Sequence, residues 1–388
     1  MRQENNSSLQ PFRAEDWWKS KAALLMGFVY LYGLWFNISF EKFIPLSILS
    51  ILEISGFASF GYLINDYFDQ EKDFIAGKKN FLLNKSILMQ VSLILTSLFL
   101  IALPWIYLPT TRLSYSLIFI EFLLFFIYSC PPIRFKERGI WGVIIDALYA
   151  HTLPTLLAAY TFLLASSSAL PIVPFVLLFI WQLANGIRNI LLHQLEDKGK
   201  DIFSATNTFI KTIALQDLRV ILVSVLLMEM ISSLSFFIVL TTFQFWFCGG
   251  IIIISVLYFI AFREFSRLGF EKILHATLRY FPNSIYEKWL PILYLLILSC
   301  FNCFFLAFLF LHIAIFNFNL YQQVAKRIFL LWKMIPFNFV YYHILIPIRI
   351  FISSIVNHSI YYFFLLFSIN LKKENLSAWE YFKLKRRK

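Results

Sequence analysis

Long runs of apolar residues dominate this chain, and short polar stretches separate them. Each run has about the twenty residues that a helix needs to cross the hydrocarbon core of a bilayer. The pattern predicts transmembrane helices at residues 21–39, 44–65, 86–108, 113–130, 140–166, 170–193, 219–241, 243–262 and 289–316. A further apolar stretch at 339–369 contains His343, Arg349 and His358, which fits either a tenth span or a helix in the membrane interface. The expected fold is therefore all-α, a polytopic membrane protein with nine or ten transmembrane helices.

The composition favours one membrane domain over several soluble ones. Hydrophobic residues make up 60% of the chain and charged residues only 14%, and no Pro/Ser-rich linker interrupts it. The first twenty residues lack the apolar core and cleavage site of a secretory signal, so the first span is expected to be retained. We expect a polar cytoplasmic segment at 1–20, a transmembrane domain at 21–316 and a C-terminal extension with a basic tail at 317–388.

Lysine and arginine are distributed unequally between the two sets of loops. Most lie in the loops after the second, fourth, sixth and eighth expected helices, and the opposite loops offer only Lys42 and Arg112. The positive-inside rule then places the N-terminus and the basic loops on the cytoplasmic side. The expected location of the protein is a plasma (inner) membrane. These loops also explain the net charge of +12, so a nucleic-acid partner is not expected.

The C-terminus does not fit a strict count of nine spans. Nine crossings would export the basic ending "KLKRRK", against the positive-inside rule. A tenth crossing would return this tail to the cytoplasm but leave Lys326, Arg327 and Lys333 outside. The sequence leaves both arrangements open.

An acidic cluster, "NDYFDQEKD" at 65–73, follows the second apolar run. In a helix, Asp66, Asp69 and Asp73 would share one face within roughly 60° of each other. Carboxylates stacked in this way repel one another, which makes them a poor structural device. They suit Mg²⁺, which takes hard oxygen ligands and commonly bridges carboxylates to a phosphate. The alternative is a solvated surface on which lysines balance the charge.

A second acidic cluster, "HQLEDKGKD" at 193–201, follows the sixth apolar run. Asp197 and Asp201 are four positions apart, with His193 one turn earlier on the same face. The pattern Asp-x-x-Lys-Asp occurs in both clusters, ending at Asp73 and at Asp201. Each is soon followed by an asparagine, Asn80 or Asn207, and each ends an even-numbered span. This repetition indicates an internal duplication and favours a functional site over a charge-balanced surface.

Two carboxylate clusters that hold magnesium beside an apolar bundle suit a lipid with a diphosphate head. Metal ions and lysines stabilise a leaving diphosphate. If the lipid is an allylic prenyl chain, ionisation leaves a carbocation, which aromatic faces stabilise while water is excluded. The substrate class indicated is therefore a prenyl diphosphate.

At this point the chain resembles a known family, the UbiA superfamily of intramembrane prenyltransferases. Its N-D-x-x-D-x-x-x-D motif is matched by Asn65, Asp66, Asp69 and Asp73, and its D-x-x-x-D motif by Asp197 and Asp201. The segment "YSCPPIRFKERG" at 128–139 is similar to the family's Y-S-x-P-P-x-R-x-K-x-x-G, in which Tyr128, Ser129, Pro131, Pro132, Arg134, Lys136 and Gly139 match. The resemblance covers about residues 20–316.

The resemblance implies helices around a central cavity that opens laterally to the bilayer, with Mg²⁺ as cofactor. We expect Asp66, Asp69, Asp73, Asp197 and Asp201 to be catalytic as metal ligands, together with the amide of Asn65. The residues expected to bind substrate are Asn65, Lys72, Lys79, Asn80, Tyr128, Lys136, Asn189, His193, Gln194 and Lys200. The partners are a prenyl diphosphate, the lipid bilayer and an acceptor of unknown identity.

Some alternatives remain within and outside this family. A UbiA-type terpene cyclase would ionise the prenyl diphosphate and quench the cation without an acceptor. The phosphoribosyl-transferring branch carries a basic His-Pro extension after its first motif, whereas this chain continues as "FIAGKKNFLLNKS". A cation transporter is a further alternative, although transport sites tend to lie near the membrane midplane. Soluble prenyl synthases share the chemistry but not the nine spans.

Other polar residues lie inside the expected helices. Glu53 falls within the second span, and Asp146 and His151 within the fifth. Such residues are functional by default in a membrane, although helix-to-helix hydrogen bonding is a fair alternative. Asn189, next to Arg188 in the sixth span, is nearer the Asp197 face, whereas Arg188 points the other way and is expected to be structural.

Overall fold

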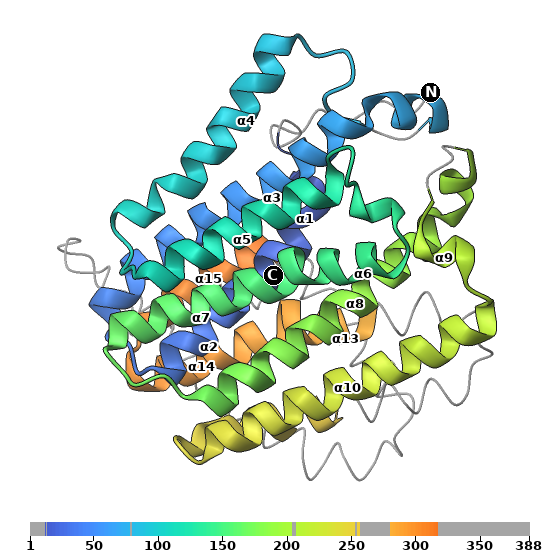
Figure 1. The fold of residues 1–388 in the computed structure, drawn as a ribbon. Coiled ribbons are helices and arrows are strands. Elements are labelled where there is room, and N and C mark those ends of the chain that lie inside the picture. The colour runs from blue at the N-terminus through green and yellow to red at the C-terminus, as the bar shows by residue number, and fades with distance from the viewer. Residues whose placement is uncertain are drawn as a thin grey trace, which may run out of the picture. The chain divides into compact units, whose positions relative to one another are not determined.

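The fold is known from a computed structural model that describes residues 12, 14–77, 80–203, 207–252, 254–256 and 280–316. The chain divides into two units, Met1–Phe318 and Asn319–Lys388, and all the described residues belong to the first. The expected extension at 317–388, with the candidate span 339–369, lies outside them. Within the described part every regular element is a helix (Figure 1), as the apolar pattern predicts.

Seven helical runs in the described part are long and apolar enough to cross a membrane. They are Phe40–Ile75, Ile87–Ile106, Arg112–Ser129, Ile140–Ser166, Ile172–Lys198, Gln216–Thr241 and Pro282–Phe301. The elements that form these runs, some of which extend beyond them, are α3 (Phe40–Ala76), α4 (Ile87–Ala102) with the 3-10 turn η3 (Pro104–Ile106), α5 (Arg112–Ser129), α6 (Ile140–Ala147), η5 (Leu148–Thr152), α7 (Leu153–Ser166), α8 (Ile172–Phe203), α10 (Leu215–Thr241), α13 (Tyr280–Ser284), η7 (Ile285–Trp289) and α14 (Leu290–Phe301). The chain is an integral membrane protein. The expected count of nine or ten spans is not confirmed by these residues.

Two of the expected spans are described only in part or in a different form. The span at 243–262 is described from η6 (Phe245–Phe247) to Val256, as a shorter apolar helix. The first span, at 21–39, is the helix α2 (Ala23–Trp35), which η2 (Trp18–Ala22) and α1 (Ala14–Trp17) extend towards the N-terminus.

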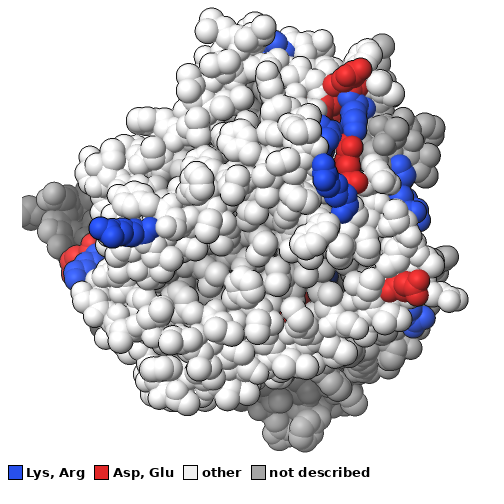
Figure 2. Space-filling view, viewed as in Figure 1, with Lys and Arg blue, Asp and Glu red and all other residues white. Residues whose placement is uncertain are grey.

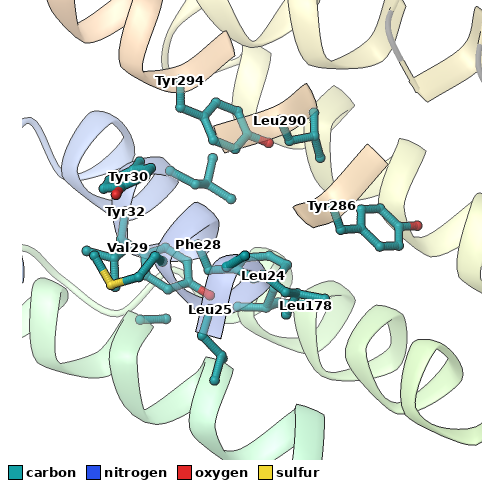
Figure 3. Close-up of a cluster of buried hydrophobic side chains, with 14 of the residues drawn as sticks. Leu24, Leu25, Phe28, Val29, Tyr30, Tyr32, Leu178, Tyr286, Leu290 and Tyr294 are labelled. Atoms are coloured by element: carbon teal, nitrogen blue, oxygen red, sulfur yellow. The ribbon is translucent and has the colours of Figure 1, made fainter. Parts of the chain in front are cut away.

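Helix α2 lies in the core of the bundle. Every one of its residues is buried, as expected for a helix that is apolar on all sides. In Figure 3 its side chains lie beside Leu178 of α8 and Tyr294 of α14. A Cβ atom on Gly27 would meet the Pro291 ring at 2.7 Å, so the glycine permits this close approach of α14. Because α2 is enclosed, its contacts along its length show in which direction each neighbouring helix runs.

The expected single span at 289–316 is wrong, because two helices occupy it. Helix α14 ends at Phe301, the backbone of the next residue, Asn302, is extended, and α15 (Phe305–Phe316) begins three residues after Asn302. The Asn302 side chain accepts a hydrogen bond from the backbone N–H of Phe304 at 3.0 Å and so holds the turn. The apolar run does not reveal this break, because isolated polar residues such as Asn302 also occur inside continuous helices.

Helix α15 runs back along α2 after this turn. Its first residue, Phe305, contacts Phe43 with ring centroids 5.0 Å apart, and its last, Phe316, contacts Trp18 at 5.3 Å. Between them, His312 Nδ1 lies 3.2 Å from the Tyr30 hydroxyl. The twelve residues of α15 extend about 18 Å, less than the hydrocarbon thickness. The described chain thus ends near the start of η2.

Candidate active site

The first acidic motif lies on the last turns of α3. This helix has 37 residues, about 55 Å in length, and so extends beyond a hydrocarbon core of about 30 Å. Asp66, Asp69 and Asp73 therefore occupy successive turns of one helix, as their spacing predicts. Gly77 ends the helix in the left-handed region at φ +61°, and its N–H donates to the carbonyls of Asp73 and Phe74.

Asn80 folds the following loop back onto this motif. Its Nδ2 donates to the backbone carbonyl of Asp66 at 2.8 Å and to Asp73 Oδ2 at 2.9 Å. The backbone N–H of Phe81 donates to Asp66 Oδ2 at 3.1 Å. The structure therefore places Asn80, expected as a substrate ligand, where it positions two carboxylates. Lys79 lies outside the described residues.

The segment between α5 and α6 brings two cations to the middle carboxylate of the motif. Arg134 Nη2 donates to Asp69 Oδ1, and Lys136 Nζ donates to Asp69 Oδ2. Lys136 Nζ also donates to Asn65 Oδ1 at 3.0 Å, and the Ser129 hydroxyl donates to the same oxygen at 3.3 Å. The two motifs that the sequence shows separately, at 65–73 and 128–139, are thus parts of one site.

Glu137 connects the cations of this site to one another. Its Oε1 accepts from Arg134 Nε at 2.6 Å and from Lys72 Nζ at 2.5 Å. Lys72, expected to bind substrate, is therefore held by a carboxylate on the loop. The row of charges from Lys72 through Glu137 and Arg134 to Asp69 alternates in sign.

The pKa values of this loop reflect burial and the neighbouring charges. Burial lowers the pKa of Lys136 below its usual value, and the nearby Arg134 lowers it further, although Asp69 opposes both. Burial alone would raise the pKa of Glu137, but hydrogen bonds from Lys72 and Arg134 outweigh it and lower that pKa. Glu137 is therefore a carboxylate at neutral pH, able to hold both cations.

The directions of α3 and α8 show that both acidic motifs lie at the same end of the bundle. Helix α3 runs antiparallel to α2. Near the start of α3, Phe43 lies directly against Gly33, close to the end of α2. Further along α3, the Tyr62 ring centroid lies 5.4 Å from Lys21 Nζ, just before the start of α2. Tyr62 is one turn before Asn65, so the first motif is at the Lys21 end of the bundle.

Helix α8 is antiparallel to α2 in the same way. Near its start Phe175 contacts Trp35 with ring centroids 5.8 Å apart, and further along Trp181 contacts Phe28 at 5.2 Å. The residues that follow, including Asp197, therefore extend towards the Lys21 end. This parallel course of α3 and α8 agrees with the internal duplication that the sequence indicates.

The second motif is described only in part. Asp197 Oδ2 lies 3.9 Å from Nε2 of the exposed His193, one turn earlier on α8. Gln194 is buried, and its Oε1 has no hydrogen-bond partner among the described residues. Lys200 and Asp201 belong to α8, but their side chains lie outside the described part.

Asn189, expected at the substrate site, takes part in a network of hydrogen bonds around the buried Arg188. Arg188 and Glu229 of α10 are fully buried and form a two-point ion pair at 2.7 and 3.0 Å. Arg188 also donates to Asn185 and Asn283, and Asn283 donates to Asn189 Oδ1 at 2.7 Å. The network ties α8 to α10 and α13, which agrees with a structural role for Arg188.

Tyr128 lies against the start of the fifth expected span. Its ring is 5.2 Å from that of Tyr149, whose hydroxyl donates to Asp146 Oδ2 at 2.7 Å. His151 is buried on the same π-helical turn, with Nδ1 3.5 Å from Asn185 Nδ2. Asp146 thus connects to the Tyr128 side of the site, and His151 to the Arg188 network.

Carboxylate and amide oxygens fit Mg²⁺ as a donor set, although no preformed cage is present among the described side chains. No three of their His, Cys, Asp and Glu residues converge as a metal centre. Magnesium commonly keeps several waters and takes only one or two protein carboxylates together with substrate phosphate. Asp66, Asp69 and Asp73 can supply such ligands without forming a closed shell.

Two residues of the charge row were not assigned by sequence reasoning. Arg134 matches the family pattern but has no role assigned from it, and Glu137 stands at an unspecified position of that pattern. The available signal was the spacing of Arg134 and Glu137, since oppositely charged residues three apart can pair.

On the face shown in Figure 2, the red and blue side chains gather mainly near the end of α3, above a broad uncharged area.

The comparisons with known proteins agree with the helical fold. The model of the UbiA prenyltransferase family matches residues 22–280, and the chain belongs to that family. A UbiA homologue from Archaeoglobus fulgidus, solved with GPP and Mg²⁺, aligns with a TM-score of 0.50 at 16% identity, covering 75% of this chain and 99% of that one. A structure described as digeranylgeranylglyceryl phosphate synthase in membranes aligns with a TM-score of 0.52 at 17% identity, covering 74% and 95%. A search of curated proteins finds no match.

Proposed function

We propose that this protein is an intramembrane prenyltransferase that ionises an allylic prenyl diphosphate and transfers the prenyl group to an acceptor. One observation carries the proposal: Asp69 of the first acidic motif is bound to Arg134 and Lys136 of the segment after α5. Asp69, which can bind a metal ion, therefore lies in contact with Arg134 and Lys136, which can bind a phosphate group. Family membership and the archaeal homologue solved with GPP and Mg²⁺ support the same chemistry.

The metal ligands in this proposal are Asn65, Asp66, Asp69, Asp73, Asp197 and Asp201. Mg²⁺, when bound, supplies positive charge that stabilises the departing diphosphate. Arg134 and Lys136 then lie beside it, and a diphosphate entering the site offers them stronger acceptors than a carboxylate already shared with a metal. Lys72, Lys79 and Lys200 supply further positive charge, with Lys72 oriented by Glu137.

The cations around Asp69 also order the binding of metal and substrate. Arg134 and Lys136 repel a divalent cation at this carboxylate when no anion is present. A diphosphate, with several negative charges, removes this repulsion. Metal and prenyl diphosphate are therefore expected to bind together, each raising the affinity for the other.

The protein's own side chains must also keep the ionised chain away from water. Tyr149 contacts both Phe125 and Tyr128, with ring centroids 4.5 and 5.2 Å apart. Aromatic faces in such a position attract a carbocation and exclude water.

The site is proposed to face the cytoplasm from a plasma or inner membrane, since the basic loops lie at this end.

Product analysis tests this proposal and separates transfer from cyclisation. Purified protein in detergent is incubated with farnesyl or geranylgeranyl diphosphate and Mg²⁺, with and without a lipid extract as a source of acceptor. We expect a prenylated product only with the extract. A cyclised hydrocarbon formed without acceptor would identify a terpene cyclase, and no magnesium-dependent consumption of either diphosphate would contradict both functions.

A further inference from the structure

Two glutamates lie buried together inside the membrane-spanning part, away from the acidic motifs. Glu121 of α5 is fully buried and Glu53 of α3 is 8% exposed. Both carboxylate oxygens of Glu121 are buried without a hydrogen-bond partner among the described residues. Phe122, next to Glu121, contacts Phe57, one turn after Glu53, so the two acids lie about one helical turn apart on packed helices. A buried acid without a partner is costly, so its presence needs an explanation.

The packing of α3 shows where this pair lies. Gly56, three positions after Glu53, lies against the backbone of Ile101 in α4. The next residue, Phe57, contacts Phe122 of α5, with ring centroids 5.4 Å apart. Glu53 therefore faces the groove between α4 and α5. Glu121 faces α3, because Phe125, one turn later on α5, lies directly against Gly61.

The pair is separate from the proposed active site. Asp69 lies sixteen positions after Glu53 on the same helix, about 24 Å along it and about 160° around it. The carboxyl group of Glu53 therefore points away from the motif face, towards helices that contribute no metal ligand.

No described cation neutralises these two acids. Helices α4 and α7, which pack against α3 and α5, carry no charged side chain. The basic residues nearest in sequence are Lys42, about 16 Å from Glu53 along α3, and Arg112, about 13 Å from Glu121 along α5. The titratable groups on the packed elements are bonded elsewhere, Tyr160 to Thr111 and Tyr149 to Asp146. Two adjacent carboxylates in an apolar interior would be strongly unfavourable.

We propose that Glu53 and Glu121 form an intramembrane site that binds at least one proton. One carboxyl group is then a neutral acid, and at most one negative charge remains in the interior. The site lies where α3 packs against α5. These are the two helices that carry Asp69 and that lead into Arg134 and Lys136, so the site fixes their relative position.

The carbonyl stretch of a protonated carboxyl group tests this directly by infrared spectroscopy of the wild-type protein in lipid. At neutral pH exposed carboxyl groups, with an ordinary pKa of about 4, are ionised and give no such band. We expect a carboxylic-acid band that shifts on deuterium exchange and is lost in the Glu53→Gln/Glu121→Gln variant. Glu41→Gln, which removes an exposed acid at the start of α3, should retain it.

The wild-type measurement remains decisive if the double variant does not fold. Absence of a carboxylic-acid band at neutral pH would overturn the proposal. So would a band that appears only when sodium and potassium are removed, since the pair would then hold a monovalent cation in place of a proton. A band retained in a folded double variant would place the neutral acid elsewhere.

Discussion

Arg134 and Glu137, three positions apart, form an ion pair with Nε and Oε1 separated by 2.6 Å, while the other side of the guanidinium binds Asp69. Arginine presents its donors in a rigid fork, so fixing one side with Glu137 orients the other. Because Glu137 also holds Lys72, a single carboxylate positions two of the cations proposed to meet the diphosphate.

Replacing Glu137 by glutamine should weaken substrate binding more than it slows the chemical step. The amide no longer holds Lys72 and Arg134 by charge, so each cation must be ordered when the diphosphate arrives. We expect the apparent KM for the prenyl diphosphate to rise about three- to tenfold, from the loss of about 1 kcal/mol of charge-assisted hydrogen bonding. Steady-state kinetics at saturating Mg²⁺ measure this.

Glu71→Gln is the matched control, since Glu71 is an exposed acid on the same turn of α3 as Lys72. Its KM should stay within about twofold of wild type. Equal increases in both variants would show that general surface charge, and not positioning by Glu137, determines the affinity. Glu137→Asp, which retains the charge, should recover part of the loss.

Lys136 should limit substrate binding on the alkaline side. Its pKa is below the usual lysine value, chiefly because it is buried, so in the free enzyme it loses its proton at a lower pH than an exposed lysine. Lys136→Arg keeps the charge throughout this range. We expect the KM of the wild type to rise with pH while that of Lys136→Arg rises less. Parallel pH profiles would assign the alkaline limb to another group.

The Arg188–Glu229 pair should contribute to stability as a unit. Removing one partner, as in Glu229→Gln, leaves a buried arginine whose charge is no longer matched, and we expect a loss of about 3–5 kcal/mol. Arg188→Met combined with Glu229→Gln should restore much of this, because the unmatched charge is gone. Thermal unfolding in detergent provides the comparison. A double variant less stable than both single variants would contradict a structural role.

The two acidic motifs should be reached from one side of the membrane. Lys79→Cys and Lys200→Cys, each in a background without the four native cysteines, should both react with a membrane-impermeant maleimide only from the cytoplasmic side. The parallel course of α3 and α8 is the reason. Labelling of the two positions from opposite sides would exclude a site that contains both motifs.

The helical position of Asp66, Asp69 and Asp73 could be predicted from the sequence because spacing along a helix is a local property. The pairing of Asp69 with Lys136 could not, since these residues are 67 positions apart and their meeting depends on how α3 packs beside α5. The reversal at Asn302 was missed for a different reason. Two short apolar helices and one long span have the same hydropathy, and only the single asparagine marks the turn.

The structure also changes what is expected of Asp69 variants. The sequence predicts Asp69 as a metal ligand, and in the structure it also balances two partly buried cations. Its replacement should therefore lower thermal stability as well as activity. Activity must be measured on protein shown to be folded, and Asp69→Asn, which keeps the shape and one hydrogen-bond acceptor, is the better variant.

Magnesium-dependent release of diphosphate from geranylgeranyl diphosphate, with acceptor extract present, tests the central claim most directly. Wild type and folded Asp69→Asn are compared at equal concentration in detergent, each with Mg²⁺ and with a chelator. The proposed site predicts release by the wild type only with Mg²⁺, and a loss of at least about a hundredfold in Asp69→Asn, as for other groups that stabilise developing charge. Release by folded Asp69→Asn at the wild-type rate would contradict it.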